Sequence, residues 1–449
     1  MTGRRFGGER AVVVGAGVAG AAAARVLVAE GADVRITEAL PEAELSDTAA
    51  LREIGVDVRA GGHEPDHLDG ATLVVVSPGV SPHADVIRWA RDRGLPSWGE
   101  MELGAQLADA PYIAVTGTNG KTTTAGMVAA CLRVAGVDAA ACGNIGHPFP
   151  VAAREGHEAL VVECSSFQLA MQESFHPRVS VLLNVAPDHL DWHGSFEAYA
   201  AAKARIFARQ TGGDTHVGNR DDVRAATLSR RARCRLAWFS EHEPANGEVG
   251  YRAAELVSMF GEPERLGRIP ADRAGFRANA AAAAACALAY GVSPRAVEDG
   301  LRGFVPAPHR GETVAEYEGV RFVDDSKATN VHAATAALAG VIDVVLIAGG
   351  RAKGADLTPL AASAGHLRGV VAIGEAASQL TEIFETLVPV VTAGSIEDAV
   401  RRAFKMSGPG STVLLAPACA SWDQFRDYRE RGDRFAAAAR SLREVDVRG

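Results

Sequence analysis

The residues best suited to chemistry form a short loop, Gly-Thr-Asn-Gly-Lys-Thr at positions 117–122. Glycines in such a turn let successive backbone N–H groups point inward, where they can hold phosphate oxygens. Lys121 adds a positive charge for the terminal phosphates, and the Thr122 hydroxyl can hold Mg²⁺. The loop departs from the strict P-loop pattern, because Val115 stands where that pattern has its first glycine. We therefore predict a variant phosphate-binding loop rather than an ordinary strand-to-helix turn.

Two other polar residues follow apolar runs that are typical of buried strands. Glu163 comes directly after one such run, and His189 follows the next. Because the carboxyl ends of neighbouring parallel strands converge, we expect both side chains to lie beside the phosphate loop. A carboxylate and an imidazole in that place could hold a second divalent cation. Asp188 and Asp191 are rival ligands, and each of these side chains, taken alone, could instead be structural.

A second glycine turn, Gly15-Ala16-Gly17-Val18-Ala19-Gly20, matches the dinucleotide fingerprint. Glu38 stands at the end of the next expected strand, where an acid that binds ribose would be. Oxidoreductases use this arrangement, other nucleotide-binding proteins use it too, and a purely structural turn also fits. Nothing downstream suggests a site for hydride transfer. We therefore favour binding of a nucleotide diphosphate without redox chemistry.

A layered α/β fold would place these loops at the edges of parallel sheets. Three sections of the chain each begin with an apolar strand followed by glycine and a helical pattern, which is βαβ patterning. We predict an α/β protein with three domains, 1–98, 99–305 and 306–449, and short strands and loops over about 212–270. The expected strands are Ala11–Val14, Asp33–Thr37, Leu73–Val76, Tyr112–Val115, Ala159–Val162, Val179–Leu183, Val344–Ala348, Gly369–Ile373 and Thr412–Leu415, and an alanine-rich helix is expected over Arg277–Ala289.

Composition places the chain among soluble globular proteins. Of its 449 residues, 47% are hydrophobic and 22% are charged, which is too apolar for a disordered chain. Forty-six basic and fifty-five acidic residues give a net charge of −9 without a block of like charge, which argues against nucleic acid or an anionic membrane as a partner. The six cysteines are scattered without a Cys-x-x-Cys pair, so we predict reduced thiols and a cytoplasmic location.

The N-terminus has a second interpretation. Arg4-Arg5 precede an apolar run over residues 11–24, as in an export signal. A glycine turn within the run, and Arg25 at its end, favour a strand, a turn and a helix instead. The longest other apolar tract, over residues 278–290, is too short to cross a bilayer.

Motifs spread over nearly the whole chain, and in the same order, resemble the Mur ligase family. The middle section carries three of them and the C-terminal section carries the rest. They are Gly117–Thr124, Glu163–Leu169 and Asn184–Asp191, then Pro308-His309-Arg310, Asp325–Asn330, and Ser421–Phe425 with Arg431-Gly432.

The resemblance implies an ATP-dependent ligase that phosphorylates a carboxylate and lets an amine attack the acyl phosphate to form an amide. The implied substrates are ATP, UDP-N-acetylmuramoyl-L-alanine and D-glutamate, in peptidoglycan precursor synthesis. Since the γ-phosphate and the carboxylate are both anions, cations must neutralise them as they meet. The implied domains are a Rossmann-like one for the uridine diphosphate, a central P-loop ATPase-like one, and a Rossmann-like C-terminal one for the amino acid. We expect a monomer.

By the same resemblance, Thr122 and Glu163 bind Mg²⁺ at the nucleotide and His189 binds a second Mg²⁺. Lys203 corresponds to a lysine that CO₂ converts to a carbamate. An ammonium beside Mg²⁺ would be repelled and its pKa lowered, whereas the free amine can add CO₂ and become an anionic ligand. Without the resemblance, Lys203 would be interpreted as a solvated helix lysine.

The remaining roles are implied in the same way. The chain departs from the family pattern at Phe276, where an asparagine is often found, at Tyr428, where phenylalanine is usual, and at Ala39, where relatives can have arginine. Catalysis is assigned to Lys121, Glu163, His189, Lys203, Lys327 and Arg310; ATP binding to Gly117, Thr118, Asn119, Gly120, Lys121, Thr122, Thr123, Asn279, Arg310 and Asp325; binding of the UDP-linked substrate to Gly15, Gly17, Gly20, Glu38, Ser77, Pro78, Gly79 and Asn144; and binding of the amino acid to Thr329, Lys353, Ser421 and Tyr428.

Three alternative functions stay open. An NAD-dependent oxidoreductase would rest on the Gly15–Gly20 turn alone. A catalytically silent nucleotide-binding regulator is disfavoured, because the full set of implied catalytic residues is present. The same ligase chemistry with L-glutamate or another acidic amino acid is the main alternative, because the chirality of the amine cannot be read from the sequence.

Overall fold

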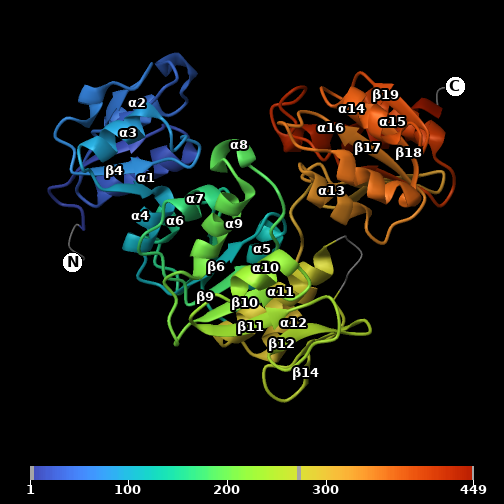
Figure 1. Ribbon diagram of the computed structural model, residues 1–449, viewed down its shortest axis with the longest axis horizontal. Helices are drawn as coiled ribbons and strands as arrows, with labels where there is room; N and C mark the ends of the chain where they lie inside the picture. Colours follow the sequence, from blue (N-terminus) through green and yellow to red (C-terminus); the bar gives the residue numbers. More distant parts are fainter. Residues whose placement is uncertain (1–4, 270–274, 447–449) are drawn as a thin grey trace. The chain divides into compact units, whose positions relative to one another are not determined.

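The computed structural model describes residues 5–269 and 275–446 (Figure 1). These residues form three sheets flanked by helices, which confirms the predicted α/β fold class. Their contacts divide the chain into two compact units. One comprises residues up to 269 together with 278–304, and the other includes the chain from residue 305 onward. No helix within the described ranges is long and apolar enough to span a membrane.

The first sheet has five parallel strands in the order β3-β2-β1-β4-β5. Both of its faces are covered, which explains why its central strands are almost entirely apolar. Ala11 and Val13 of β1 pack into one hydrophobic cluster, and Val12 and Val14 pack into another. The elements are β1 (Arg10–Val14), α1 (Val18–Ala29), β2 (Asp33–Thr37), α2 (Thr48–Glu53), β3 (Asp57–Arg59), β4 (Leu73–Val76), α3 (Asp85–Asp92), β5 (Ser97–Gly99) and α4 (Glu100–Leu107).

The second sheet has nine strands in the order β14-β13-β12-β11-β10-β9-β6-β8-β7. Strand β6 lies between β8 and β9, so the chain crosses from one side of β6 to the other, and the loops after these three strands meet at one edge. Its strands are β6 (Tyr112–Thr116), β7 (Ala139–Gly143), β8 (Ala159–Glu163), β9 (Val179–Leu182), β10 (Thr215–Asn219), β11 (Arg235–Phe239), β12 (Glu248–Arg252), β13 (Glu255–Ser258) and β14 (Glu264–Arg265). Its helices are α5 (Lys121–Val134), α6 (Phe149–Ala152), α7 (Ser166–Ala170), α8 (Leu190–His193), α9 (Phe196–Ala204), the 3₁₀ turn η3 (Arg205–Phe207), α10 (Val223–Ser229), α11 (Phe276–Tyr290) and α12 (Pro294–Arg302).

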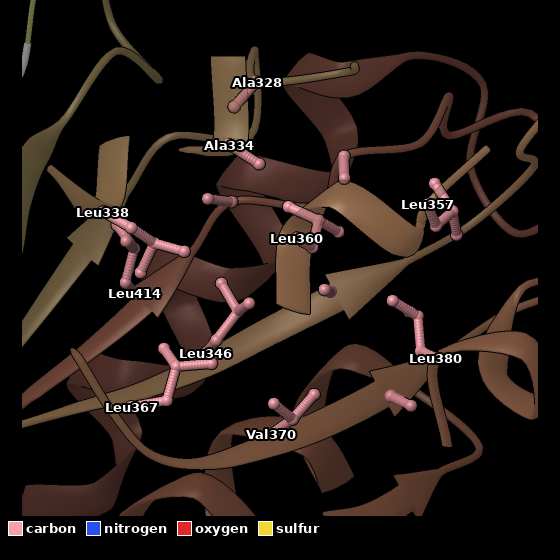
Figure 2. Close-up of a cluster of buried hydrophobic side chains, with 14 of the residues drawn as sticks. Ala328, Ala334, Leu338, Leu346, Leu357, Leu360, Leu367, Val370, Leu380 and Leu414 are labelled. Atoms are coloured by element: carbon pink, nitrogen blue, oxygen red, sulfur yellow. The ribbon is translucent and has the colours of Figure 1, made fainter. Parts of the chain in front are cut away.

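The third sheet has the order β15-β16-β20-β17-β18-β19, and only the β15–β16 pair is antiparallel among its described strands. Figure 2 shows the cluster on one of its faces, where Leu346, Val370 and Leu414 of three strands meet Leu338 and Leu380 of the covering helices. The elements are β15 (Glu312–Tyr317), β16 (Val320–Asp324), α13 (Val331–Leu338), β17 (Val344–Gly349), η4 (Thr358–His366), β18 (Leu367–Ile373), α14 (Ala377–Phe384), β19 (Val390–Ala393), α15 (Ile396–Met406), β20 (Thr412–Leu415) and α16 (Tyr428–Asp446).

All nine expected strands are present, with ends shifted by at most two residues. The poorly patterned segment contains the short strands β10 to β14, as expected, together with α10. Glu163 does not follow its strand but is the last residue of β8. The predicted boundary after residue 98 falls within β5, which pairs with β4 through Gly99.

Candidate active site

The phosphate loop joins β6 to α5 at the centre of the second sheet. Gly120 has a φ of 84°, and a Cβ there would lie 2.3 Å from Asn279 Oδ1, so this position requires glycine. The Lys121 ammonium folds back over the loop and donates hydrogen bonds to the carbonyls of Gly117 and Thr118, both at 2.9 Å. The loop therefore carries its positive charge at the N-terminus of α5, which is the place that favours phosphate.

Thr122, Glu163 and Asn144 meet beside this loop, as the sequence predicted for the first two. The Thr122 hydroxyl donates to Glu163 Oε2 at 2.8 Å, and the Asn144 amide donates to Glu163 Oε1 at 3.2 Å. Gly143 permits this approach, since a Cβ there would lie 2.3 Å from the Glu163 carbonyl oxygen. The Glu163 side chain comes from the buried end of β8 and belongs to a residue that is only 2% exposed. Its position is thus fixed from two sides.

The loop after β9 is attached to the phosphate loop by reciprocal hydrogen bonds. Asn119 N donates to Asn184 Oδ1 at 2.8 Å, and Asn184 Nδ2 returns a bond to Asn119 O at 3.2 Å. The Thr118 hydroxyl lies 2.9 Å from the Tyr199 hydroxyl and accepts from Ala186 N at 3.0 Å. The sequence motif contained Asn184, but its role as a clamp on Asn119 emerges only from the folded loops.

His189 belongs to the same edge of the sheet. It adopts a left-handed conformation with a φ of 52°, and its imidazole packs against the edge of the Phe167 ring with centroids 4.7 Å apart. The nearby Asp188 accepts from His189 N at 3.0 Å, and its other oxygen lies 3.7 Å from His189 Nε2. The side chain of Asp191, the other rival ligand, lies outside the described part of the structure.

Lys203 is buried on the inner face of α9 and is 2% exposed. Its Nζ donates to the Gly117 carbonyl at 2.8 Å and lies 4.6 Å from the centre of the Tyr199 ring. Burial, and then the neighbouring charge of Lys121, hold the pKa of the Lys203 amine well below its usual value. Lys203 is therefore not the solvated lysine that its position on a helix would suggest, and the low pKa favours a nucleophilic free amine.

The oxygen atoms beside the phosphate loop fit a magnesium ion that is shared with a nucleotide. Among residues 5–269 and 275–446, no three His, Cys, Asp or Glu residues gather as a closed metal cage. Mg²⁺, however, is commonly held by one or two carboxylates together with phosphate oxygens and water. Thr122 and Glu163, whose side chains meet at 2.8 Å, provide a hydroxyl and a carboxylate of that kind.

At the other glycine turn, the loops after β1, β2 and β4 come together. Gly20 must be glycine, because a Cβ there would lie 1.9 Å from the Gly15 carbonyl oxygen. Glu38 accepts a hydrogen bond from Ala16 N at 2.6 Å, and the Ser77 hydroxyl donates to the Gly15 carbonyl at 3.2 Å. Of the residues predicted for the UDP-linked substrate, Gly15, Gly20, Glu38 and Ser77 thus come together here, whereas Asn144 lies beside the phosphate loop. Pro78 and Gly79 follow Ser77 in the same loop.

Two histidines that the sequence did not single out lie beside this turn. The Thr37 hydroxyl, at the end of β2, is 2.9 Å from both His63 Nδ1 and His67 Nδ1. Burial is the main reason why the pKa of His63 is lowered. His63 precedes a short 3₁₀ helix, η2 (Pro65–Leu68), and His67 belongs to it. Nothing in the local sequence indicated that they would converge on Thr37.

In the C-terminal unit, the loops that carry Arg310 and Lys327 share buried supports. His309, which precedes Arg310, has a φ of 63° and holds Asp324 through Nδ1 at 2.7 Å. Burial raises the pKa of Asp324, against the opposing effect of His309. The Lys327 ammonium lies 4.2 Å from the centre of the Tyr428 ring, so the tyrosine packs against a predicted catalytic residue. Asp325 directly follows β16, two residues before Lys327.

Lys353 lies in the segment that follows β17, and Ser421 lies in the segment that follows β20. The segments are joined by a bridge between Arg351 and Ala420. The Lys353 ammonium lies 4.0 Å from the centre of the Trp422 ring, which is unusually exposed at 59%. Ser421 is buried, and Thr329 follows Lys327 in the loop before α13. Trp422 belongs to the Ser421–Phe425 motif, but nothing in the sequence predicted its cation–π contact with Lys353.

A P-loop-like centre with an acid on the adjacent strand, in a chain with a further α/β unit, is typical of proteins that bind a nucleoside triphosphate with Mg²⁺. The chain belongs to the Mur ligase family. The profile of the MurD-like N-terminal domain of Mur ligases matches residues 9–99, that of the Mur ligase middle domain matches 115–287, and that of the Mur ligase glutamate ligase domain matches 309–419. The family accordingly makes this chain an amide-forming ligase that uses ATP.

Similar proteins extend over almost the whole chain. UDP-N-acetylmuramoylalanine–D-glutamate ligase of Frankia casuarinae is 45% identical over 453 residues, covering 97% of this chain and 95% of the relative. The enzyme of that name from Streptomyces coelicolor is 41% identical, covering 97% and 99%. Among solved structures, the UDP-N-acetylmuramate-alanine ligase MurC of Thermotoga maritima has a TM-score of 0.59 at 20% identity, over 96% of this chain and 99% of that one. A pseudomurein peptide ligase type C from Methanothermus fervidus reaches 0.62 at 17% identity, over 97% and 100%. The two structures bear on the fold alone.

Proposed function

We propose that this ligase joins D-glutamate to UDP-N-acetylmuramoyl-L-alanine in the cytoplasm, as a step of peptidoglycan precursor synthesis. The choice of substrates is supported by two relatives named UDP-N-acetylmuramoylalanine–D-glutamate ligase, which are 45% and 41% identical to this chain over nearly their full lengths. The observation that carries the chemistry is the direct contact of Thr122 with Glu163 at the phosphate loop. These two side chains supply a hydroxyl and a carboxylate that could hold the Mg²⁺ needed to bring two anions together.

The reaction we propose has two steps. A carboxylate oxygen of the UDP-linked substrate attacks the γ-phosphorus of ATP, the bond from that phosphorus to the β-γ bridging oxygen breaks, and ADP leaves. The amine of glutamate then attacks the acyl carbon, the carbon–oxygen bond to phosphate breaks, and the nitrogen loses a proton to give the amide. Lys121 would place positive charge on the terminal phosphates.

Thr122 and Glu163 would hold Mg²⁺ at the nucleotide, and His189 would contribute to a second Mg²⁺. The ions would supply positive charge to the phosphate oxygens, as metal ions do in phosphoryl transfer. Asn144, which donates to Glu163, would orient that carboxylate and face the substrate. Phe167 would hold the His189 ring in place through their edge-to-face contact.

We further propose that Lys203 is carbamylated. Its neutral amine would attack the carbon of CO₂ and lose one proton, leaving an anionic carbamate that can ligate magnesium. The burial of Lys203 and its lowered pKa support this step, because only the free amine is nucleophilic. The carbamate would also place a negative charge beside the Lys121 ammonium.

Each of the three parts of the chain would bind one of the substrates. Residues 1–98, 99–305 and 306–449 would act as the uridine diphosphate, ATP and amino-acid domains. In the last of these, Lys353 would bind the side-chain carboxylate of glutamate beside Ser421, Thr329 and Tyr428, while Arg310, Lys327 and Asp325 would act on the phosphates and ribose. The position of the Lys353 ammonium over the exposed Trp422 ring supports its role in binding a carboxylate.

One assay tests the proposal. Phosphate release is measured with UDP-N-acetylmuramoyl-L-alanine, ATP and Mg²⁺, and with D-glutamate, L-glutamate or neither. We expect release that depends on D-glutamate, and a product whose mass equals the two substrates less water. Faster turnover with L-glutamate would overturn the specificity and keep the chemistry. An absence of release with either isomer, for a folded protein that binds ATP, would refute the ligase reaction.

A further inference from the structure

A pocket of about 590 Å³ lies on the side of α9 opposite the phosphate loop, between α9, η3 and α10. This volume is within the range of sites that bind small molecules, roughly 300–1,000 Å³. Tyr199 and Lys203 of α9 face the protein interior, whereas Phe196, Ala200 and Ala204, which are four residues apart, line the pocket. None of the residues assigned above to a substrate lines it, so the proposed active site does not account for it.

The lining combines an apolar floor with a basic rim. Phe196, Phe207 and Leu228 contribute to the floor, while the lining as a whole contains four arginines and a single glutamate. This local excess of positive charge contrasts with the net charge of −9 of the chain. Among the described residues no carboxylate forms an ion pair with Arg231 or Arg233, although ion pairs are frequent elsewhere in the same unit. The charge complement of this rim is an anion.

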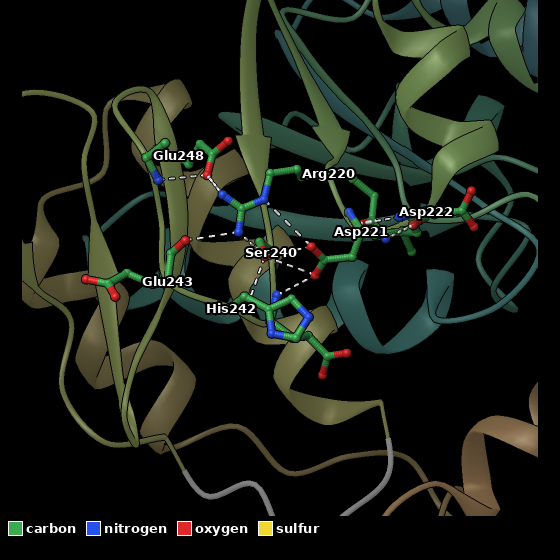
Figure 3. A network of polar contacts seen from close by, with 11 residues as sticks. Arg220, Asp221, Asp222, Ser240, His242, Glu243 and Glu248 are labelled. Atoms are coloured by element: carbon green, nitrogen blue, oxygen red, sulfur yellow. Dashed lines mark hydrogen bonds and ion pairs between the residues drawn. The ribbon is translucent and has the colours of Figure 1, made fainter.

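The walls of the pocket are held in place by contacts on their far sides. Asp222 caps α10 by accepting from Ala225 N at 2.8 Å, and its other oxygen accepts from Val185 N at 3.2 Å. Next to it, Asp221 and Arg220 form a network with Ser240 and Glu248 that joins the start of α10 to neighbouring strands (Figure 3). The pocket is therefore preformed, and ligand binding would not have to order these walls.

We propose that this pocket is a regulatory binding site for a small amphipathic anion, with an aromatic or aliphatic body and one sulfonate, carboxylate or phosphate group. The body would contact the apolar floor, and the anionic group would face Arg231 and Arg233. The site is coupled to the phosphate loop through the helix that forms its wall, because Tyr199 of α9 is bonded to Thr118 and Lys203 to Gly117. A second connection runs from α10 through Asp222 to Val185, in the loop after β9.

Binding is tested with 8-anilinonaphthalene-1-sulfonate as an anionic probe and N-phenyl-1-naphthylamine as its uncharged analogue, both by fluorescence titration of the full chain. The proposal expects one saturable site for the sulfonate. Arg231→Glu with Arg233→Glu should weaken the sulfonate at least tenfold and the uncharged analogue much less. Ala201→Trp, which places a large side chain on an exposed pocket residue, should weaken both. Arg91→Glu with Arg295→Glu makes the same charge change at exposed sites elsewhere and should weaken neither.

Circular dichroism confirms that each variant is folded, because a loosened core would also bind the probe. Equal sulfonate affinity in the pocket variants and the wild type would overturn the proposal, as would displacement of the probe by UDP or ATP with simple competition. Coupling is measured separately, as the affinity for a non-hydrolysable ATP analogue with and without saturating sulfonate. We expect a change of at least threefold, and an unchanged affinity would refute the regulatory role. Because neither measurement uses the ligase reaction, the site and the proposed function can fail independently.

Discussion

Arg431 provides a direct measure of how much one buried charge contributes to the C-terminal unit. The residue is 0% exposed, and its guanidinium donates to Ser326 Oγ at 3.0 Å, to Ser326 O at 2.9 Å and to Cys419 O at 3.2 Å. It thereby joins the loop that carries Lys327 to the segment that precedes Ser421. Arg431→Met keeps much of the apolar length but leaves these three acceptors without their donor.

The size of the effect follows from two opposing contributions. Three hydrogen bonds from a charged donor, at roughly 1.5–3 kcal/mol each, contribute about 4–9 kcal/mol. Burial of the charge opposes this, since it lowers the pKa of Arg431 from 12.5 to about 10, which corresponds to about 3 kcal/mol. The pKa still leaves the group charged at neutral pH. We therefore expect Arg431→Met to lower the free energy of unfolding of the C-terminal unit by about 3 kcal/mol.

The assay is urea unfolding followed by hydrogen exchange and mass spectrometry, which reports on each unit separately. Peptides from β16, β17 and β20 should exchange at lower urea in Arg431→Met, while peptides from β6 and β8 should be unchanged. Arg434→Met is the matched control on the same helix, because its ion pair with Glu397 is 42% and 38% exposed and should contribute less than about 1 kcal/mol. If the two variants lose equal stability, the buried hydrogen bonds of Arg431 stabilise the unit no more than an exposed ion pair does, and the reasoning is refuted.

Four further predictions address other parts of the molecule. Glu163→Gln keeps the side-chain shape but removes its charge, so kcat should fall at least about 100-fold with little change in melting temperature. The variant should also need more Mg²⁺ for activity, and unchanged turnover would contradict the magnesium role. Lys203→Ala should be inactive and partly rescued by added acetate, and a folded variant that no small carboxylate rescues would contradict the carbamate. Gly20→Ala should unfold at clearly lower urea, since its Cβ would meet a carbonyl oxygen at 1.9 Å, whereas Gly17→Ala, with nothing within 4 Å, should not. Burial raises the pKa of Glu100 from 4.5 to about 7, so between these pH values the folded state retains a proton that the unfolded chain has released. The free energy of unfolding should therefore fall by up to about 3 kcal/mol as the pH rises from 4.5 to 7. Glu100→Gln should reduce this dependence of stability on pH.

Much of this structure could be predicted because the relevant signals are local. Most of the nine expected strands are short apolar runs followed by glycine or polar residues, and a strand covered on both faces leaves that pattern in the sequence. The phosphate loop is similar, because its glycines and Lys121 stand within a few residues of one another. The contact of Thr122 with Glu163 could be predicted as well, since adjacent parallel strands end at the same edge.

Contacts between distant segments with no shared pattern could not be predicted. Arg431 is followed by a glycine in a helix with many arginines, and only folding shows that its side chain, unlike that of Arg434, is fully buried. His63 and His67 converge on Thr37 from a loop and a short 3₁₀ helix whose course the sequence does not specify. Phe276 illustrates a related difficulty: it departs from the family pattern at an expected contact position, and only the folded chain shows that it is a buried residue at the start of α11.

The position of Lys203 shows how a contact across 86 residues can set chemistry. Its ammonium nitrogen and that of Lys121 both donate to one carbonyl oxygen, that of Gly117, at 2.8 Å and 2.9 Å. Burial, and then repulsion from the neighbouring Lys121 charge, lower the pKa of the Lys203 amine well below its usual value. The neutral form of the buried Lys203 amine is therefore favoured. A neutral amine reacts with CO₂, and the resulting carbamate would turn the repulsion into an attraction. The surroundings that disfavour an ammonium at Lys203 thus favour a carbamate there. A carbamate at that position could serve as an anionic ligand for a metal ion beside the phosphates.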